Sequence, residues 1–246
     1  MPRYTTHSHY GEIFVPGQTV LEASEYGVTG VAADDQTTAL QAAIDACQAL
    51  VVSNLYGAPI LKLPPGQITL TAAIDWKSCG ISGAWPNVGT RIVWNGSAGG
   101  TVFRKWATAH AGGNSFGLLE NVNFRSGSNE PATFIDFTTQ TGQVDQVMRL
   151  QNIHFVGCSG DAIKVASWIN CHWMHLRFDL VGGYAIRLTP ASSINLSSFR
   201  LDGFTYDHSR VSGPGGGVLM IDNTADASNL GTFSLANGRI RENGRR

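Results

Sequence analysis

The sequence predicts an all-β chain of short strands that stack on one another, closed at its N-terminal end by a single helix. Two observations predict this fold class. Short segments of alternating apolar and polar residues recur throughout the chain beyond residue 90, and only one segment, near the start, has the periodicity of a helix. Units this short cannot bury an apolar face alone, so they have to stack.

The helix is predicted over residues 35–50. Asp34 or Asp35 precedes it as a suitable N-cap, because a short carboxylate accepts the free backbone N–H groups of the first turn. We therefore interpret the two aspartates as helix-start residues, in preference to a general acid and base. One apolar face recurs at steps of three and four residues and is formed by Leu40, Ala43, Ile44, Cys47 and Leu50.

The segment after the helix, "LKLPPGQITL" from Leu61 to Leu70, reads as strand, tight turn and strand. Together with "EYGVTG" and "DDQTTALQAAIDAC", it resembles the N-terminal region of the pectate-lyase-like right-handed β-helix superfamily. That superfamily includes rhamnogalacturonase/epimerase-like domains and bacteriophage tailspikes. The resemblance covers about residues 20–85. It implies a single-stranded right-handed parallel β-helix of about six or seven coils with an N-terminal capping α-helix. We expect an N-terminal arm over 1–20 and one β-helix domain over 21–246.

A repeat supports this fold independently. Five segments align without gaps and start 31, 23, 23 and 39 residues apart: "LENVNF" (119–124), "LQNIHF" (150–155), "WMHLRF" (173–178), "LSSFRL" (196–201) and "LANGRI" (235–240). A second set runs out of phase with the first: "FIDF" (134–137), "AIKV" (162–165), "AIRL" (185–188) and "VLMI" (218–221). Two strands therefore recur in each repeating unit.

Stacking the five segments predicts columns of side chains. One interior column is Val122, Ile153, Leu176 and Phe199, and the next is Phe124, Phe155, Phe178, Leu201 and Ile240. The third position of each segment is predicted to be a bend, because asparagine tolerates left-handed backbone angles and stacked amides can form a hydrogen-bonded ladder. The bend column holds Asn121, Asn152, His175, Ser198 and Asn237.

Function is expected in the outward columns, where residues on neighbouring strands lie about 4.8 Å apart. His154, Arg177 and Arg200 share one such column, and Asp179 and Asp202 share the column two residues later. The two aspartates, about 5 Å apart, are the first catalytic candidates for a retaining glycosidase. The favoured interpretation is a ladder of surface ion pairs, because the flanking arginines would keep both carboxylates ionised.

An intermediate hypothesis assigns His154, Arg177 and Arg200 to binding acidic sugar or phosphate oxygens. Trp168 or Trp173 would offer the sugar a stacking face. On the other strand of the unit the outward column is Asp136, Lys164, Arg187 and Met220, and the first two form a predicted cross-strand pair.

No metal or cofactor is expected. The four cysteines, at 47, 79, 158 and 171, show no CxxC spacing and are interpreted as isolated buried thiols. His172 and His175 would point to opposite faces of a strand unless a bend intervenes. A formal net charge of −1 gives no global attraction to nucleic acid or membrane. No apolar stretch approaches the roughly 20 residues of a membrane span, and the N-terminus lacks the pattern of a secretory signal.

The superfamily's enzyme motifs are missing: the sequence contains no Gly-His-Gly, no Asn-Thr-Asp and no Asp-Asp on a late coil. The resemblance therefore implies a fold and does not carry an active site with it. We expect a structural virion protein of a bacteriophage-like particle, made in the host cytoplasm: a short tailspike, a tail-fibre element or a capsid-decorating protein. Expected partners are two further copies in a homotrimer, other virion proteins and a host-surface polysaccharide. The alternative is a polysaccharide lyase or glycoside hydrolase.

Strand-like sequence continues almost to Arg246, so the last strands are expected to need a cover. Another copy, another protein or the tail itself could supply it.

Overall fold

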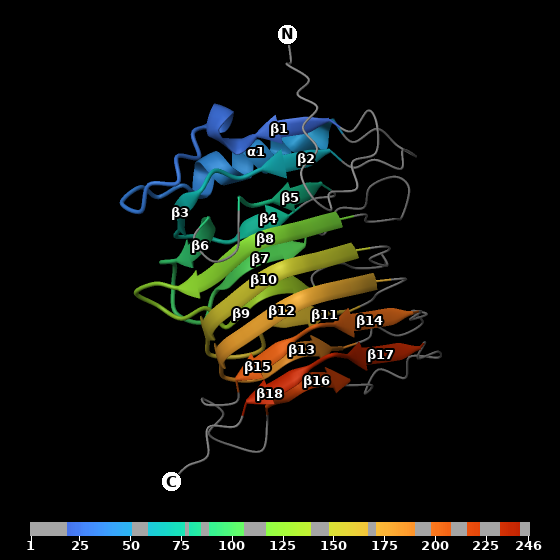
Figure 1. The fold of residues 1–246 in the computed structure, drawn as a ribbon. Helices are drawn as coiled ribbons and strands as arrows, with labels where there is room; N and C mark the ends of the chain where they lie inside the picture. The colour runs from blue at the N-terminus through green and yellow to red at the C-terminus, as the bar shows by residue number, and fades with distance from the viewer. Residues whose placement is uncertain are drawn as a thin grey trace.

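The computed structural model describes residues 19–50, 59–76, 79–84, 89–105, 117–138, 148–166, 171–189, 198–207, 216–221 and 232–241. Within these residues the chain is mostly β-strand, with one α-helix and one short 3-10 helix. Figure 1 shows the strands stacked in chain order, from the helix at one end to β16, β17 and β18 at the other. Every strand pairs in parallel with strands that come earlier or later by a whole repeat.

The strands form three rows. The first row is β1 (Val20–Glu22), β2 (Ile60–Lys62), β5 (Gly80–Ser82), the first parts of β8 (Gly117–Ser126), β10 (Met148–Cys158) and β12 (Cys171–Val181), then β14 (Phe199–Asp202) and β17 (Phe233–Ala236). The second row is β3 (Gly66–Leu70), β6 (Thr90–Trp94), the second parts of β8, β10 and β12, then β15 (Thr205–Asp207) and β18 (Arg239–Arg241). The third row is β4 (Ile74–Trp76), β7 (Thr101–Lys105), β9 (Thr133–Phe137), β11 (Ile163–Val165), β13 (Tyr184–Leu188) and β16 (Gly217–Ile221).

A left-handed residue separates the first row from the second. Asn121, Asn152 and His175 have φ of 57°, 53° and 53° in the middle of β8, β10 and β12. The predicted side-chain ladder is confirmed along them: Asn152 Nδ2 donates to Asn121 Oδ1 at 3.1 Å, and His175 Nδ1 lies 3.2 Å from Asn152 Oδ1. Each long strand can therefore turn from one row into the next without leaving these polar side chains unpaired.

The interior columns confirm the stacking. The rings of Phe124 and Phe155 lie 5.4 Å apart and are tilted by only 11°, and those of Phe155 and Phe178 lie 5.1 Å apart and are tilted by 10°. All three are fully buried. In the first row a single register line runs through the whole stack: Leu21, Leu61, Ile81, Leu119, Leu150, Trp173, Leu201 and Leu235.

The fourth repeat differs from the sequence-based alignment. It begins at Leu201, which pairs with Trp173, and the last two intervals are 28 and 34 residues instead of 23 and 39. Phe199 therefore pairs with Cys171, and Tyr206 takes the place expected for Leu201 beside Phe178. The bend residue is Gly203, with φ of 64°, and not Ser198. Both alignments put apolar residues inside, so alternation alone could not separate them.

Helix α1 (Thr37–Ala49) covers the N-terminal end of the stack, as predicted; it begins two residues later and ends one residue earlier than expected. Its predicted apolar face is buried except for Leu50, which lies beyond the last turn and is 46% exposed. The N-cap position is Gln36, but Asp35 still supports the helix start, because its Oδ1 accepts the Thr37 N–H at 3.0 Å. The short 3-10 helix η1 (Ala23–Tyr26) leads from β1 towards it.

All four cysteines are buried, as expected, but Cys47 is not isolated. A hydrogen bond with Cys79, which precedes β5, raises the pKa of the Cys47 thiol, and burial raises it further. The Cys47 thiol is therefore protonated at neutral pH.

Candidate functional site

Three of the predicted site residues meet on the outer side of the second row. His154 on β10 and Arg177 on β12 are register partners, and Asp179 lies two residues beyond Arg177. Asp179 Oδ2 accepts hydrogen bonds from His154 Nε2 at 2.8 Å and from Arg177 Nη2 at 2.7 Å. The side chains of His154 and Asp179 are only 12% and 16% exposed, whereas that of Arg177 is 50% exposed.

The charges of this cluster follow from burial and hydrogen bonding. Burial lowers the pKa of His154, although its contact with Asp179 acts in the opposite direction. Burial by itself would raise the pKa of Asp179, but the hydrogen bonds from Arg177 and His154 outweigh it and lower the pKa. At neutral pH the cluster therefore holds an ionised aspartate, a neutral histidine and a cationic arginine.

Further arginines surround the cluster. Arg125 lies in the same column as Asp179, two strands away, with Val156 between them. Arg91 lies in the same column as His154, two strands away, with Asn123 between them. Among the described residues, neither Arg91 nor Arg125 belongs to an ion pair. We call this surface the arginine face and define it by Arg91, Asn123, Arg125, His154, Arg177 and Asp179.

Asn123 contributes an unusual acceptor. It is 2% exposed, and its Oδ1 has no hydrogen-bond partner among the described residues. A buried carbonyl oxygen without a donor is costly, and such atoms in folded proteins call for an explanation. A ligand hydroxyl at the arginine face would supply the donor.

Arg200 and Asp202 lie elsewhere, which corrects the predicted square of alternating charge. Arg200 pairs in register with His172, and Asp202 pairs with Met174, so both belong to the first row. The bend at His175 separates this row from Asp179. Asp202 instead accepts hydrogen bonds from Arg200 Nη2 at 2.9 Å and Asn237 Nδ2 at 2.7 Å, and these bonds lower its pKa. Asp179 and Asp202 are therefore not the closely spaced pair that a retaining glycosidase uses.

Trp173 does not offer a stacking face. It is 1% exposed, points into the stack, and meets the ring of Phe199 edge-on at 5.0 Å. Its position in the first-row register line, between Leu150 and Leu201, explains why it points inward. Trp168 lies outside the described residues.

The outer side of the third row contrasts with the arginine face, because its described arginines are paired with carboxylates. Arg104 pairs with Asp75, and Arg187 Nε lies 2.5 Å from Asp161 Oδ2. Lys164 is the register partner of Asp136, as predicted. The third row can therefore serve as a control surface, because its arginines already have carboxylate partners.

The described part of the chain contains no cluster of three His, Cys, Asp or Glu residues suited to a metal ion. No helix in that part combines the length and the apolar character that crossing a bilayer requires.

Comparisons with known proteins agree on the fold. No protein-family model matches the sequence, and no curated protein matches it. The chain is similar in structure to the A-module of the mannuronan C-5 epimerase AlgE6 of Azotobacter vinelandii, with a TM-score of 0.50 and 14% identity over 82% of this chain and 62% of that module. It is also similar to the pre-mature gene product 12 of bacteriophage phi29, with a TM-score of 0.53 and 14% identity over 90% of this chain.

The likeness is to a β-helix. The epimerase module is a right-handed β-helix protein, and the likeness to it is one of fold alone. This chain spans only 33% of the phi29 protein's length and less than two thirds of the epimerase module. The tailspike of phage phiAB6 also matches, with a TM-score of 0.40 and 15% identity over 90% of this chain and 47% of the tailspike.

Sequence reasoning assigned no role to Asn123 or Arg125, and it missed Arg91. The signal for Arg91 was present: "TRIVW" alternates in the same way as the later strands, and Arg91 precedes Asn123 by 32 residues, close to the next interval of 31. The repeat was counted from residue 119 onward, so this earlier strand was left out of the column.

Proposed function

We propose that this chain is a structural protein of a phage-like particle and that its arginine face binds an acidic polysaccharide. The observation that carries the binding is that Arg91 and Arg125 have no ion-pair partner in the part of the chain that the structure describes, and that they lie near the exposed Arg177. The fold that we propose for it is a right-handed β-helix of about six or seven coils.

The chemistry of the face suits anionic groups repeated along a chain. A guanidinium group is always charged and matches carboxylate, phosphate or sulfate oxygens with a planar pair of N–H donors. The three arginines lie on β6, β8 and β12, so their guanidinium groups are spread along the stack. The buried Oδ1 of Asn123 adds an acceptor for a sugar hydroxyl between Arg91 and His154.

The particle part of the proposal starts from the fold. A phage protein has this fold over a third of its length, and a stack of parallel strands provides a rigid, extended surface for recognition. We propose a virion location and a homotrimer in which three stacks pack side by side, with other virion proteins as further partners. Detection of the chain by mass spectrometry in purified phage particles would test the location, and its absence from all particles would contradict it.

Binding is tested by titrating acidic and neutral polysaccharides into the protein at low salt. Replacing Arg91 and Arg125 by glutamine should weaken binding of the acidic polysaccharide by about tenfold or more, because each lost charged hydrogen bond costs about 1.5–3 kcal/mol. The matched control is Arg104→Gln on the third row, where the arginine already pairs with Asp75. Equal loss in the control, or equally tight binding of a neutral polysaccharide, would contradict the proposal.

One observation favours a second candidate function, a polysaccharide lyase. His154 donates its Nε2–H to Asp179, which leaves Nδ1 as a neutral acceptor on a largely buried ring. Such a group could remove a proton from a sugar that the arginines hold by its acidic group. Incubation with acidic polysaccharides would then release unsaturated, ultraviolet-absorbing products, and His154→Gln would abolish turnover while retaining binding. Binding without turnover in the unaltered protein would leave the structural role alone.

A further inference from the structure

The C-terminal end of the stack exposes residues that are interior elsewhere. Leu235 and Ile240 are 47% and 58% exposed, although their register partners Leu201 and Tyr206 are 0% and 1% exposed. Among the described residues, β17 and β18 each have a strand partner on one side only, β14 and β15 respectively. Unpaired strand edges with apolar side chains favour association with another chain.

The opposite end exposes apolar residues as well. Five large hydrophobic residues are exposed in the described part of the chain, and four of them lie at the two ends of the stack. These are Val31 and Leu50 at the N-terminal end and Leu235 and Ile240 at the C-terminal end. The exposed fractions of Val31 and Leu50 are 52% and 46%. Strand β1 is paired only with β2 among the described residues, so this end also has a free edge.

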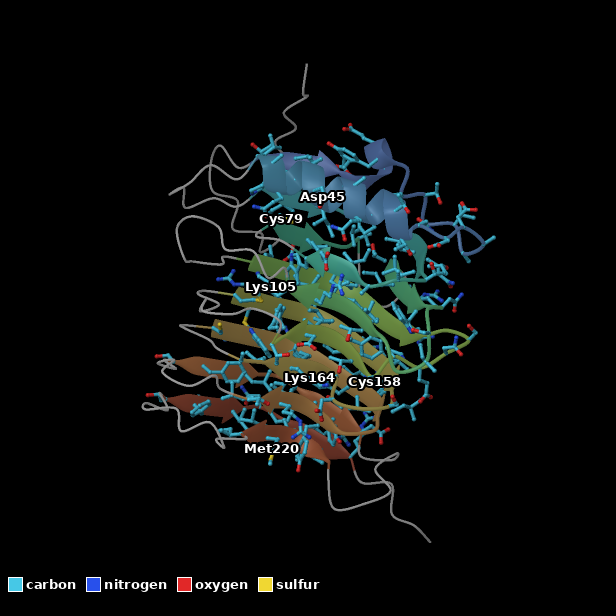
Figure 2. The ribbon with its side chains drawn as sticks, turned by 180° about the vertical axis from the view of Figure 1, so that it is seen from behind. Asp45, Cys79, Lys105, Cys158, Lys164 and Met220 are labelled. Atoms are coloured by element: carbon cyan, nitrogen blue, oxygen red, sulfur yellow. The ribbon has the colours of Figure 1, made fainter. Side chains whose placement is uncertain are left out.

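The charges of the two ends are opposite. Residues 19–50 contain no lysine, arginine or histidine, and their acidic residues are all exposed: Glu22, Glu25, Asp34, Asp35 and Asp45. Figure 2 shows Asp45 on the helix at one end of the stack and Met220 at the other. The last two described strands of the first and second rows, over 232–241, carry Arg239 and Arg241 and no acidic residue.

The two ends also match in register. In the first row Leu235 is the last residue of a line that begins with Leu21. In the second row Arg241 pairs with Asp207 at one end, and Asp35 forms a parallel bridge with Thr69 at the other. A second copy placed one strand spacing beyond the first would therefore set Leu21 beside Leu235 and Asp35 beside Arg241. All of these pairings are parallel, as within the stack.

We propose that copies of this chain stack head to tail, so that β17 and β18 of one copy pair with β1 and the Val31–Asp35 segment of the next. The contact buries the apolar residues of both ends and joins opposite charges. The contact joins two different surfaces, and it relates the copies by a shift along the stack. Such a contact does not close into a ring, so it produces rods whose length depends on protein concentration. It does not depend on polysaccharide binding, since Arg239 and Arg241 lie outside the arginine face.

Charge reversal at one end at a time tests the proposal by sedimentation over a range of concentrations at low salt. The tail variant is Arg239→Glu with Arg241→Glu, and the head variant is Glu25→Arg with Asp34→Arg. The unaltered protein should form species that grow with concentration. Each variant alone should stay at a constant mass, because like charges now meet, and a mixture of the two should grow again by alternation.

Any of three results would overturn the proposal: an unaltered protein of constant mass, variants that grow like it, or a mixture that does not recover. A constant mass of three copies in both variants would confirm the side-by-side trimer and leave the polysaccharide proposal untouched. Circular dichroism of each variant establishes that the stack is folded before its mass is compared.

The direction of stacking has its own test. Glu22→Cys and Ala236→Cys, made in separate proteins, lie on neighbouring outward positions when Leu21 meets Leu235. A short bismaleimide should link the two proteins to each other in a mixture. Neither protein should link to itself, because a contact between two copies of one variant holds only one introduced cysteine and all four native cysteines are buried. Self-linking of the Ala236→Cys protein would show a head-to-head contact and contradict the proposal.

Discussion

The residues at the bends between the first and second rows share a left-handed backbone, yet they differ in what fills the space beside them. At Gly203, which has φ of 64°, a Cβ atom would lie 2.7 Å from Cδ2 of His175. The histidine ring of one strand therefore occupies the volume that a side chain would need on the next. Only glycine satisfies both the backbone angle and this contact.

Gly203→Ala is therefore expected to destabilise the protein more than Gly99→Ala. Both glycines have left-handed φ, which costs an alanine about 1–2 kcal/mol, but a Cβ atom at Gly99 would meet nothing within 4 Å. The difference between the two free energies of unfolding, measured in urea, isolates the contact with His175. Equal losses would show that the ring moves aside without cost.

His154 makes stability depend on pH. Its pKa is lowered by burial, so below pH 6.5 the unfolded chain binds a proton that the folded chain still excludes. Stability should therefore fall as the pH drops below 6.5, and the loss should level off below the lowered pKa of the folded state. His154→Gln should reduce this slope in urea unfolding at a series of pH values. His172, whose pKa is also lowered by burial, and the aspartates with lowered pKa contribute the remaining slope, and an unchanged slope would contradict the assignment.

At the scale of an element, the cap depends on one buried amide as well as on its apolar face. Gln36 is 2% exposed and directly precedes α1. Its Oε1 accepts the N–H groups of Thr29 and Gly30 at 2.9 Å, and its Nε2 donates to the carbonyls of Val31 and Gln67 at 3.0 Å. One side chain thus ties the segment before the helix to β3.

Gln36→Ala should lower the free energy of unfolding by about 2–4 kcal/mol, because it leaves several buried backbone groups without partners. Gln41→Ala is the matched control. Gln41 also joins the helix to the stack, through the N–H and carbonyl of Asp75, but it is half-exposed and water can replace it. Chemical denaturation of both variants measures the contrast, and a larger loss for Gln41→Ala would refute this account of the cap.

For the whole molecule, stability is a sum over neighbouring strands, so a residue's contribution depends on whether strands lie on both sides of it. Leu201 and Leu235 are register partners with the same chemistry, but the first is fully buried and the second is 47% exposed. Leu201→Ala should cost about 2–5 kcal/mol, and Leu235→Ala less than half as much at low protein concentration. If head-to-tail stacking occurs, the loss for Leu235→Ala grows with concentration. Equal losses at low concentration would mean that the end of the stack is covered within one chain.

Much of the fold could be predicted from the sequence because its signals are local. The spacing of Leu40, Ala43 and Ile44 indicated the helix face, and the recurrence of Phe124, Phe155 and Phe178 indicated the interior column. The site was predicted only in part. His154, Arg177 and Asp179 were placed together correctly, because the interval between β10 and β12 is short and both strands match over their whole length.

By itself, then, the sequence determined that short parallel strands stack beneath a capping helix and which face of most strands points inward. Only the tertiary structure decided which strand lies beside which after residue 181, and so removed Arg200 and Asp202 from the site. It also placed Trp173, a predicted stacking face, inside the stack. The physical reason is that side-chain alternation has a period of two and tolerates several registers, while connections of different length cost similar free energy. The observed register brings the His175 ring against Gly203, a contact between repeats that no single segment contains.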